Sequence, residues 1–336
     1  MTPLRAILGS ALMACFFAFV PAANAGGKKP RPVPSDFVRD WTRHPAIAEM
    51  DTSAQIVGLG DVHGGYERVV ALLLKAGLIK ADARSPVKYS WAGGHRVLVC
   101  PGDLIDKGDR SLPVLDLFMA LEGQAAAGGG ALIVTLGNHE AEFLAKPNRG
   151  KATPFAAELI ASGIDPQELR TTRSPYGVWI MNRPLGARVN GWFFSHGGDS
   201  AGRTMAEWTQ IYRDAVDKAH WGSSTLVGQN NSILIDQKWW RDAARVDSNL
   251  KALGVDHIVF GHDPGAALPN KSPTGIIRPR AEGRVFPIDV GMSPAVDLSK
   301  GALLLVDRQG ALEIATEFTA EGNRNEIWRG PFRPRR

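Results

Sequence analysis

The chain has 336 residues, of which 44% are hydrophobic and 22% are charged. These shares are those of an ordinary globular protein, and the length allows one large domain or two small ones. The net charge of +5 comes partly from basic clusters near both ends. Such clusters usually form solvated tails, so we expect a basic C-terminal tail at residues 319–336 and no nucleic-acid partner.

The first 25 residues have the pattern of a cleaved export signal. Arg5 supplies a positive charge, residues 6–20 form an apolar run, and Ala23-Asn24-Ala25 offers small residues at the positions that a signal peptidase reads. The apolar run is too short to span a bilayer comfortably. We therefore predict cleavage after Ala25, a periplasmic or secreted location and no stable membrane association afterwards. The alternatives are an uncleaved membrane anchor and a lipoprotein attached through Cys15.

The chain contains only two cysteines. Cys15 would leave with the signal, so the mature chain would keep Cys100 alone and could form no intrachain disulfide. Cys100 ends an apolar run, which predicts a buried structural thiol and not a nucleophile.

Apolar runs and helical periodicity alternate through the first half of the chain. A tether at residues 26–34 is expected within an N-terminal segment of residues 26–50. Strands are then predicted at residues 55–59, 96–100 and 131–136, and helices at residues 66–76, at about 112–125 and from 141 onward. This alternation of strand and helix predicts an α/β sheet.

The second half is less regular. Helices are predicted near residues 154–161 and over 205–218, a loop over 223–236, and strands at 192–195, 256–260, 285–290, 302–306 and 312–316. The late, closely spaced strands predict a second sheet packed on the first, within one domain that spans residues 51–318.

Five short polar segments each follow an apolar run and contain glycine. They are Gly60-Asp61-Val62-His63-Gly64, Gly102-Asp103-Leu104-Ile105-Asp106, Gly137-Asn138-His139-Glu140, His196-Gly197-Gly198 and Gly261-His262. Any one of them alone is more simply explained as a solvated turn or a core histidine. Together they place polar side chains where strands end, which is where open α/β sheets bind ligands. Their carboxylates, amide and imidazoles would suffice for two metal ions that share one carboxylate.

The order of these segments resembles the phosphoprotein phosphatase family of calcineurin-like metallophosphoesterases. Within that family, Trp239-Trp240-Arg241 and Ile288-Asp289-Val290-Gly291-Met292-Ser293 look like segments of the bacterial Shewanella-like protein phosphatases. The resemblance implies an α/β fold of the calcineurin-like type, with two packed mixed β-sheets flanked by helices in an αββα sandwich.

The resemblance also implies which residues bind metal. Asp61 and His63 would bind one ion, Asp103 would bridge both ions, and the second ion would be held by Asn138, His196 and His262. Oxygen and imidazole donors without thiolate suit Mn²⁺, Fe or Zn²⁺. We expect two divalent ions, with Mn²⁺ as the first choice.

In the same way, the resemblance implies roles in catalysis. A hydroxide that bridges the two ions would attack phosphorus in line. His139 would be the general acid, with Asp106 holding its other ring nitrogen. The substrate phosphate would be bound by Arg241, Lys107 and Asn138. Lys107 stands where the family usually has arginine, and lysine lacks the planar fork for bidentate binding.

These features predict an exported metal-dependent phosphatase for phosphate monoesters, carried by a phosphoprotein or a small molecule, with phosphotyrosine as one candidate. The alternative is a phosphodiesterase or dinucleoside-polyphosphate hydrolase that uses the same metal site. A more remote alternative is a metal- or phosphoprotein-binding module without turnover. The natural substrate and the oligomeric state do not follow from the sequence.

Overall fold

The computed structural model describes residues 36–228, 231–267 and 276–333, all within one compact unit that runs from residue 35 to the C-terminus. The predicted export signal, its cleavage site and the tether lie outside these residues. Within the described ranges, no helix has both the length and the apolar character needed to cross a membrane.

One sheet has six strands in the order β13-β12-β11-β2-β5-β6. Its strands are β2 (Ile56–Leu59), β5 (Val97–Cys100), β6 (Ala131–Val134), β11 (Ala302–Gln309), β12 (Leu312–Thr319) and β13 (Arg324–Pro331). β2, β5 and β6 run parallel, whereas β11 pairs antiparallel with both β2 and β12. Every residue of β2 and β5 is buried, as expected for short apolar runs at the centre of a covered sheet.

The other sheet has five strands in the order β1-β7-β8-β9-β10. Its strands are β1 (Ile47–Met50), β7 (Gly186–Val189), β8 (Trp192–Ser195), β9 (His257–Phe260) and β10 (Val285–Pro287). Only β7 and β8 pair antiparallel. Val99 and Leu304 of the first sheet and Phe194 and Phe286 of this sheet belong to one buried apolar cluster. The two mixed sheets are therefore packed face to face. The prediction that the late strands form the second sheet is wrong for β11 and β12, which extend the first sheet through the pairing of β11 with β2, whereas β10 does belong to the second sheet.

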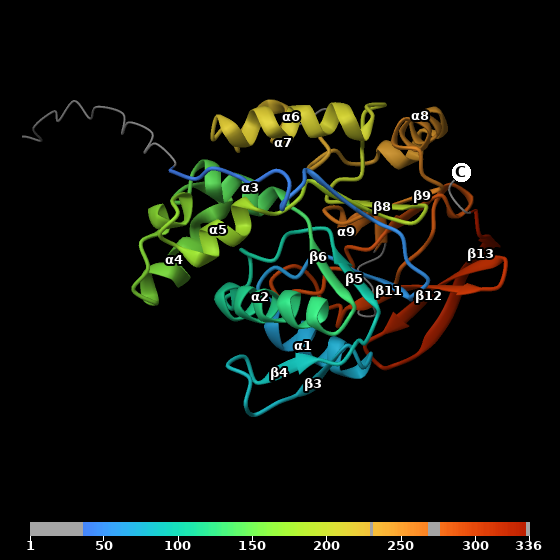
Figure 1. The fold of residues 1–336 in the computed structure, drawn as a ribbon, viewed down its shortest axis with the longest axis horizontal. Coiled ribbons are helices and arrows are strands. Elements are labelled where there is room, and N and C mark those ends of the chain that lie inside the picture. The colour runs from blue at the N-terminus through green and yellow to red at the C-terminus, as the bar shows by residue number, and fades with distance from the viewer. Residues whose placement is uncertain (1–35, 229–230, 268–275, 334–336) are drawn as a thin grey trace, which may run out of the picture. The chain divides into compact units, whose positions relative to one another are not determined.

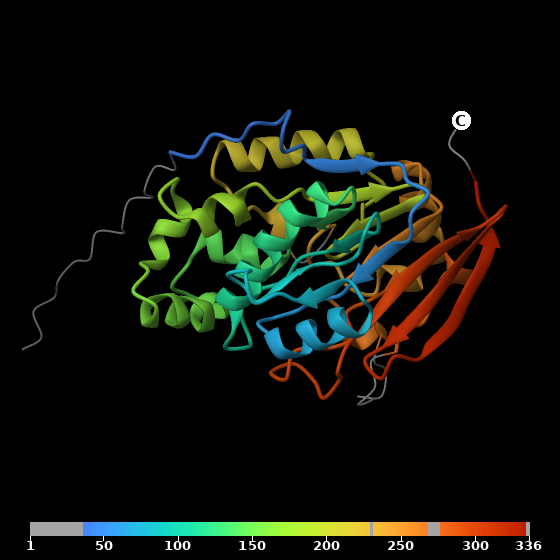
Figure 2. The same cartoon turned by 60° about the horizontal axis from the view of Figure 1, so that its bottom comes forward.

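Helices cover the outer faces of this sandwich. α1 (Tyr66–Lys75) buries four apolar side chains, contacts α2 (Ser111–Ala127), and α2 packs on β6. Figures 1 and 2 show α1 on one side of the sheets and α6 (Met205–Asp217) on the opposite side. The remaining longer helices are α3 (Asn138–Ala145), α4 (Thr153–Ala161), α5 (Pro175–Met181) and α8 (Ala243–Leu253). The predicted αββα class is confirmed.

Shorter elements complete the fold. They are the hairpin of β3 (Ile79–Ala81) and β4 (Tyr89–Trp91), the helices α7 (Ser224–Val227) and α9 (Pro264–Ala267), and the 3₁₀ turns η1 (Gly150–Ala152), η2 (Pro166–Arg170), η3 (Trp239–Arg241) and η4 (Ala281–Gly283). α7 lies inside the segment that the sequence predicts as a loop.

The two ends of the domain differ from the prediction. The expected basic tail contains β13, which pairs antiparallel with β12. Backbone hydrogen bonds hold this strand, while most of its side chains remain exposed or half-buried, so no apolar run marks it in the sequence. At the other end, β1 pairs with β7, and the buried Arg39 donates to the carbonyl oxygens of Met181 and Arg183 at 2.9 and 3.0 Å. The domain therefore includes residues before 51 and after 318.

Candidate metal centre

The six predicted metal ligands lie just beyond the carboxyl ends of five strands. Asp61 and His63 follow β2, Asp103 follows β5, and Asn138 follows β6 and begins α3. His196 and His262 follow β8 and β9 of the other sheet. Because β2, β5 and β6 are parallel to one another and β8 is parallel to β9, each group of ends meets at one edge of its sheet.

One group of donors surrounds Asn138. Its Oδ1 lies 3.0 Å from His196 Nε2 and 3.0 Å from His262 Nδ1. His196 Nε2 also lies 3.2 Å from Asp103 Oδ2. The Asn138 amide nitrogen donates to Glu142 at 3.1 Å, which turns its oxygen toward the two imidazoles. The structure thus brings together all four ligands predicted for the second ion.

A second group of donors shares Asp103 with the first. His63 Nε2 lies 3.4 Å from Asp103 Oδ2 and 3.9 Å from Asp61 Oδ2. Ligand atoms of Asp103, His63 and His139 lie within 4.8 Å of one another, as do those of Asp103, His196 and His262. Asp103 is thus common to both groups, as expected for a carboxylate between two ions.

The histidines present neutral nitrogens to this centre. Burial lowers the pKa of His63 to about 3 and that of His262 to about 3, so both rings keep a lone pair for a cation. The Nδ1 atoms of His63 and His196 face the carbonyl oxygens of Ile105 and Pro101, each at 3.0 Å. That contact makes Nδ1 the donor and leaves Nε2 as the ligand atom.

Two buried carboxyl groups at the centre have raised pKa values, because burial disfavours their negative charge. Burial, together with Asp289 and Asp103, raises the pKa of Asp61 well above its usual value. Burial also raises the pKa of Asp289 to about 6. Three buried carboxyl groups at one place are costly unless cations balance them. Buried oxygen and nitrogen donors with this charge balance fit divalent metal ions.

His139 begins the segment after Asn138 but forms a different contact. Its Nδ1 lies 3.0 Å from Asp106 Oδ2, and its Nε2 lies 3.9 Å from Asp103 Oδ2. Burial alone would lower the pKa of His139, but Asp103 and Asp106 outweigh it and raise that pKa. Asp106 is itself fixed, because its Oδ1 accepts the backbone N–H of Phe155 at 3.1 Å. Asp106 thus fixes the orientation of the ring, with Nε2 directed toward Asp103.

Glu140 holds two of the loops together. Its buried carboxylate accepts the backbone N–H groups of Asp103 and Leu104 at 2.9 and 2.8 Å, and that of Gly137 at 3.0 Å. The loop that carries Asp103 and the turn that carries Asn138 are therefore fixed to one another. This role of Glu140 is not visible in the sequence, because its backbone partners lie up to 37 residues away.

The backbone at the centre is unusual. His63, Asp103 and His262 have φ angles of 44°, 53° and 62°, and Asp106 and Lys107 have 64° and 61°. L-residues pay about 1–2 kcal/mol each for this left-handed conformation. Such residues cluster at functional sites, where the surrounding structure imposes them.

The three predicted phosphate-binding residues are placed differently. Asn138 belongs to the donor groups described above. Lys107 is exposed, and its Nζ lies 2.9 Å from His63 Nε2. Arg241 is also exposed, and its guanidinium lies over Trp240, 5.0 Å from the ring centroid. Within the described ranges, no hydrogen bond or ion pair connects Arg241 to the metal-ligand residues, so its phosphate contact stays a prediction.

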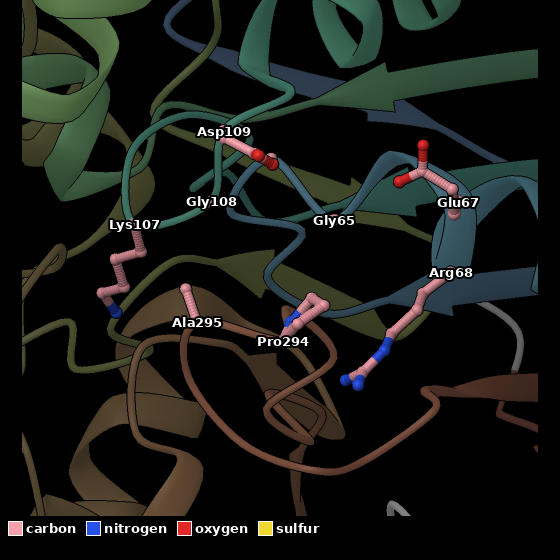
Figure 3. A pocket seen from close by; sticks show the side chains of 9 residues that line it. Gly65, Glu67, Arg68, Lys107, Gly108, Asp109, Pro294 and Ala295 are labelled. Carbon is pink, nitrogen blue, oxygen red and sulfur yellow. The ribbon is translucent and has the colours of Figure 1, made fainter.

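A pocket of about 340 Å³ adjoins the centre on the Lys107 side. Figure 3 shows the Lys107 and Arg68 side chains on either side of Pro294 and Ala295. Arg68 is engaged in structure, because it donates to the carbonyl oxygens of Met292 and Asp297 at 2.8 and 3.1 Å. Of the predicted site residues, Lys107 lines this pocket, and the predicted metal ligands do not.

Two mixed sheets with a buried, carboxylate-bridged set of oxygen and imidazole donors at their strand ends define a metal-dependent phosphoester hydrolase. The family model described as calcineurin-like phosphoesterase matches residues 54–266. The chain belongs to this family, which confirms the family, the fold and the class of enzyme predicted above.

Three individual proteins show how far the likeness extends. An uncharacterized protein of Schizosaccharomyces pombe is 25% identical over 264 residues, which cover 71% of this chain and 74% of that protein. Shewanella-like protein phosphatase 2 of Arabidopsis thaliana is 34% identical over 86 residues, 26% of this chain and 20% of the plant protein. The cold-active protein-tyrosine phosphatase of a psychrophilic Shewanella species superposes with a TM-score of 0.67 at 22% identity, covering 84% of this chain and 82% of that one. This last likeness concerns the fold.

Proposed function

We propose that this chain is a phosphatase that hydrolyses phosphate monoesters with two divalent metal ions. The observation that carries the proposal is the His139–Asp106 pair at the two donor groups that share Asp103, because Asp106 binds one ring nitrogen of His139 while the other lies 3.9 Å from Asp103 Oδ2. A protein that only binds metal has no use for a protonated imidazole held at this place. The proposal is also supported by two relatives that are named phosphatases.

The ions would be held by Asp61, His63 and Asp103 on one side and by Asp103, Asn138, His196 and His262 on the other. When bound, they would supply Lewis acidity and an activated water for in-line attack on phosphorus. Mn²⁺ is the proposed ion, with Fe or Zn²⁺ as alternatives.

The chain's own residues would then complete the reaction. His139 gives the proton on Nε2 to the leaving-group oxygen as its bond to phosphorus breaks. Asp106 keeps the ring oriented and favours its charged form through Nδ1. Lys107, Arg241 and Asn138 would hold the phosphate oxygens, with Lys107 acting as a point charge.

The proposal is tested with protein stripped of metal and reloaded with Mn²⁺. We expect faster hydrolysis of p-nitrophenyl phosphate than of bis(p-nitrophenyl) phosphate, and loss of both activities on chelation. A preference for the diester would instead favour the phosphodiesterase or dinucleoside-polyphosphate hydrolase. Metal bound at full occupancy without turnover of either compound would favour a binding module.

We also propose that the protein is exported, on the strength of the N-terminal residue pattern. Expressed in a Gram-negative bacterium, it should be found in the periplasm or medium with Gly26 as its first residue. Cell fractionation and N-terminal sequencing check this. Unprocessed protein in the cytoplasm would contradict the proposal.

A further inference from the structure

Two arginines lie over one tryptophan near the metal centre. The guanidinium carbon of Arg241 lies 5.0 Å from the ring centroid of Trp240, and that of Arg280 lies 5.1 Å from it. Cation–π attraction holds a guanidinium near an aromatic face without using its N–H donors.

This group of cations lacks carboxylate partners. Burial, Arg278 and Arg241 all lower the pKa of Arg280, and no acidic side chain opposes them. Nearby arginines differ, since Arg245 and Arg284 form ion pairs with aspartates. All 34 acidic residues of the chain lie within the described ranges. None of those carboxylates pairs with Arg241, Arg278 or Arg280 there.

Two buried donors beside these cations are also unpaired. The Trp240 Nε1 and Arg280 Nε atoms have no hydrogen-bond partner among the residues that the structure places. Among the residues with described positions, the Arg280 guanidinium makes one hydrogen bond, in which Nη2 donates to the Ala266 carbonyl at 2.7 Å. Asp242, the acidic neighbour of Arg241, is occupied in capping α8 through the N–H groups of Ala244 and Arg245. The cluster thus offers donors and positive charge without an acceptor.

The cluster is tied to the loops of the metal centre. Ala266, which Arg280 contacts, lies four residues after His262. Trp239, next to Trp240, donates its Nε1–H to the carbonyl of Gly197 at 2.8 Å, and Gly197 follows His196. Hydrogen bonds thus connect Arg280 and Trp239 to the segments that follow His262 and His196.

We propose that Arg280, which lies over Trp240, and the exposed Arg278 two residues before it form a subsite for a second anionic group of the substrate. This group would be a carboxylate or phosphate located next to the phosphoester that is hydrolysed. Guanidinium groups bind both anions in a bidentate manner. The position of the reacting phosphate rests on the function proposed above, whereas the preference for a second anion is separately measurable.

The test compares two phosphotyrosine peptides that differ only in glutamate or glutamine beside the phosphoresidue. A second arm compares fructose 1,6-bisphosphate with fructose 6-phosphate. Binding is measured by competition on metal-loaded protein carrying His139→Ala, and kcat/KM is measured on the protein with His139 intact. We expect roughly tenfold tighter binding of the more acidic ligand in one arm, the effect of about one charge-assisted hydrogen bond.

The variants are Arg278→Gln alone and Arg278→Gln with Arg280→Gln. Both variants should bring the ratio of the affinities for the more and the less acidic ligand toward one. Both should leave kcat on p-nitrophenyl phosphate unchanged, because that substrate has no second anion. Arg280→Lys should retain more of this affinity ratio than the double glutamine variant does, since lysine keeps the positive charge but lacks the planar guanidinium. Arg84→Gln is the matched control, because it removes the same charge from a side chain that is 95% exposed.

A ratio of one in both arms, or a ratio that Arg278→Gln leaves unchanged, would overturn the subsite. Arg278 is exposed, so its replacement keeps the test valid even if the double variant does not fold. Discrimination between the peptides assigns the second anion to a side chain, and discrimination between the sugars assigns it to a phosphate. Loss of turnover on every monoester with the binding ratio intact would contradict the proposed function and leave the subsite standing.

Discussion

Replacing Asp103 with asparagine is expected to abolish turnover and to lower the metal content of the protein. Asp103 Oδ2 lies 3.2 Å from His196 Nε2 and 3.4 Å from His63 Nε2, so one oxygen serves both donor groups. An amide removes the negative charge that would lie between two cations. We expect kcat on p-nitrophenyl phosphate to fall by roughly 10⁴-fold or more, as when one member of a catalytic unit is removed. Elemental analysis should find fewer than two ions per chain.

Asp109→Asn provides the matched control for that substitution. Asp109 lies in the same loop and is exposed, so the same chemical change there should leave metal content and kcat close to those of the unaltered protein. A fully active Asp103→Asn protein with two bound ions would rule out a centre in which Asp103 is shared.

Replacing His139 with alanine is expected to lower kcat by about 10²–10⁴-fold, the usual contribution of a general acid. The loss should be larger for an alkyl phosphate than for p-nitrophenyl phosphate, because nitrophenolate leaves without much help from a proton. Asp106→Asn should give part of the same loss, since Asp106 holds the ring 3.0 Å away.

The pH dependence distinguishes an acid from a ligand. Asp103 and Asp106 raise the pKa of His139 against the effect of burial, so the protonated ring persists to higher pH than in a free histidine. The kcat of the unaltered protein should therefore fall as pH rises through this raised pKa, and the His139→Ala protein should lack that decline. Both ions should remain bound in His139→Ala, and loss of one ion would reassign His139 as a ligand. His95→Ala, at an exposed histidine, is the control.

The loops that carry the proposed metal ligands could be located from the sequence because they are local. Each consists of a polar residue and glycine after an apolar run, and these runs form β2, β5, β6, β8 and β9. The same runs predicted most of the strands, but not that β11 and β12 join the sheet of β2, β5 and β6, because that pairing depends on contacts distant in sequence.

The features that escaped prediction depend on contacts distant in sequence. Glu140 contributes through backbone groups 35 to 37 residues away, and nothing in its own segment reveals those partners. Arg280 is one of several arginines in a polar stretch, and only folding brings it to Trp240, 40 positions earlier. β1 and β13 are edge strands, which lack the buried apolar runs that mark the central ones.

The position of β13 bears on how the protein can be handled. β13 is the outermost strand of the six-stranded sheet, and its exposed side chains include the ion pair of Arg329 with Glu326 at 2.8 Å. Charged edge strands keep sheets from joining those of other molecules. Truncation after residue 319, intended to remove a basic tail, would instead remove the strand that pairs with β12. The backbone N–H and C=O groups of β12 would then be exposed and could pair with another molecule. An affinity tag is better attached through a linker beyond residue 331 than fused directly to the end of β12.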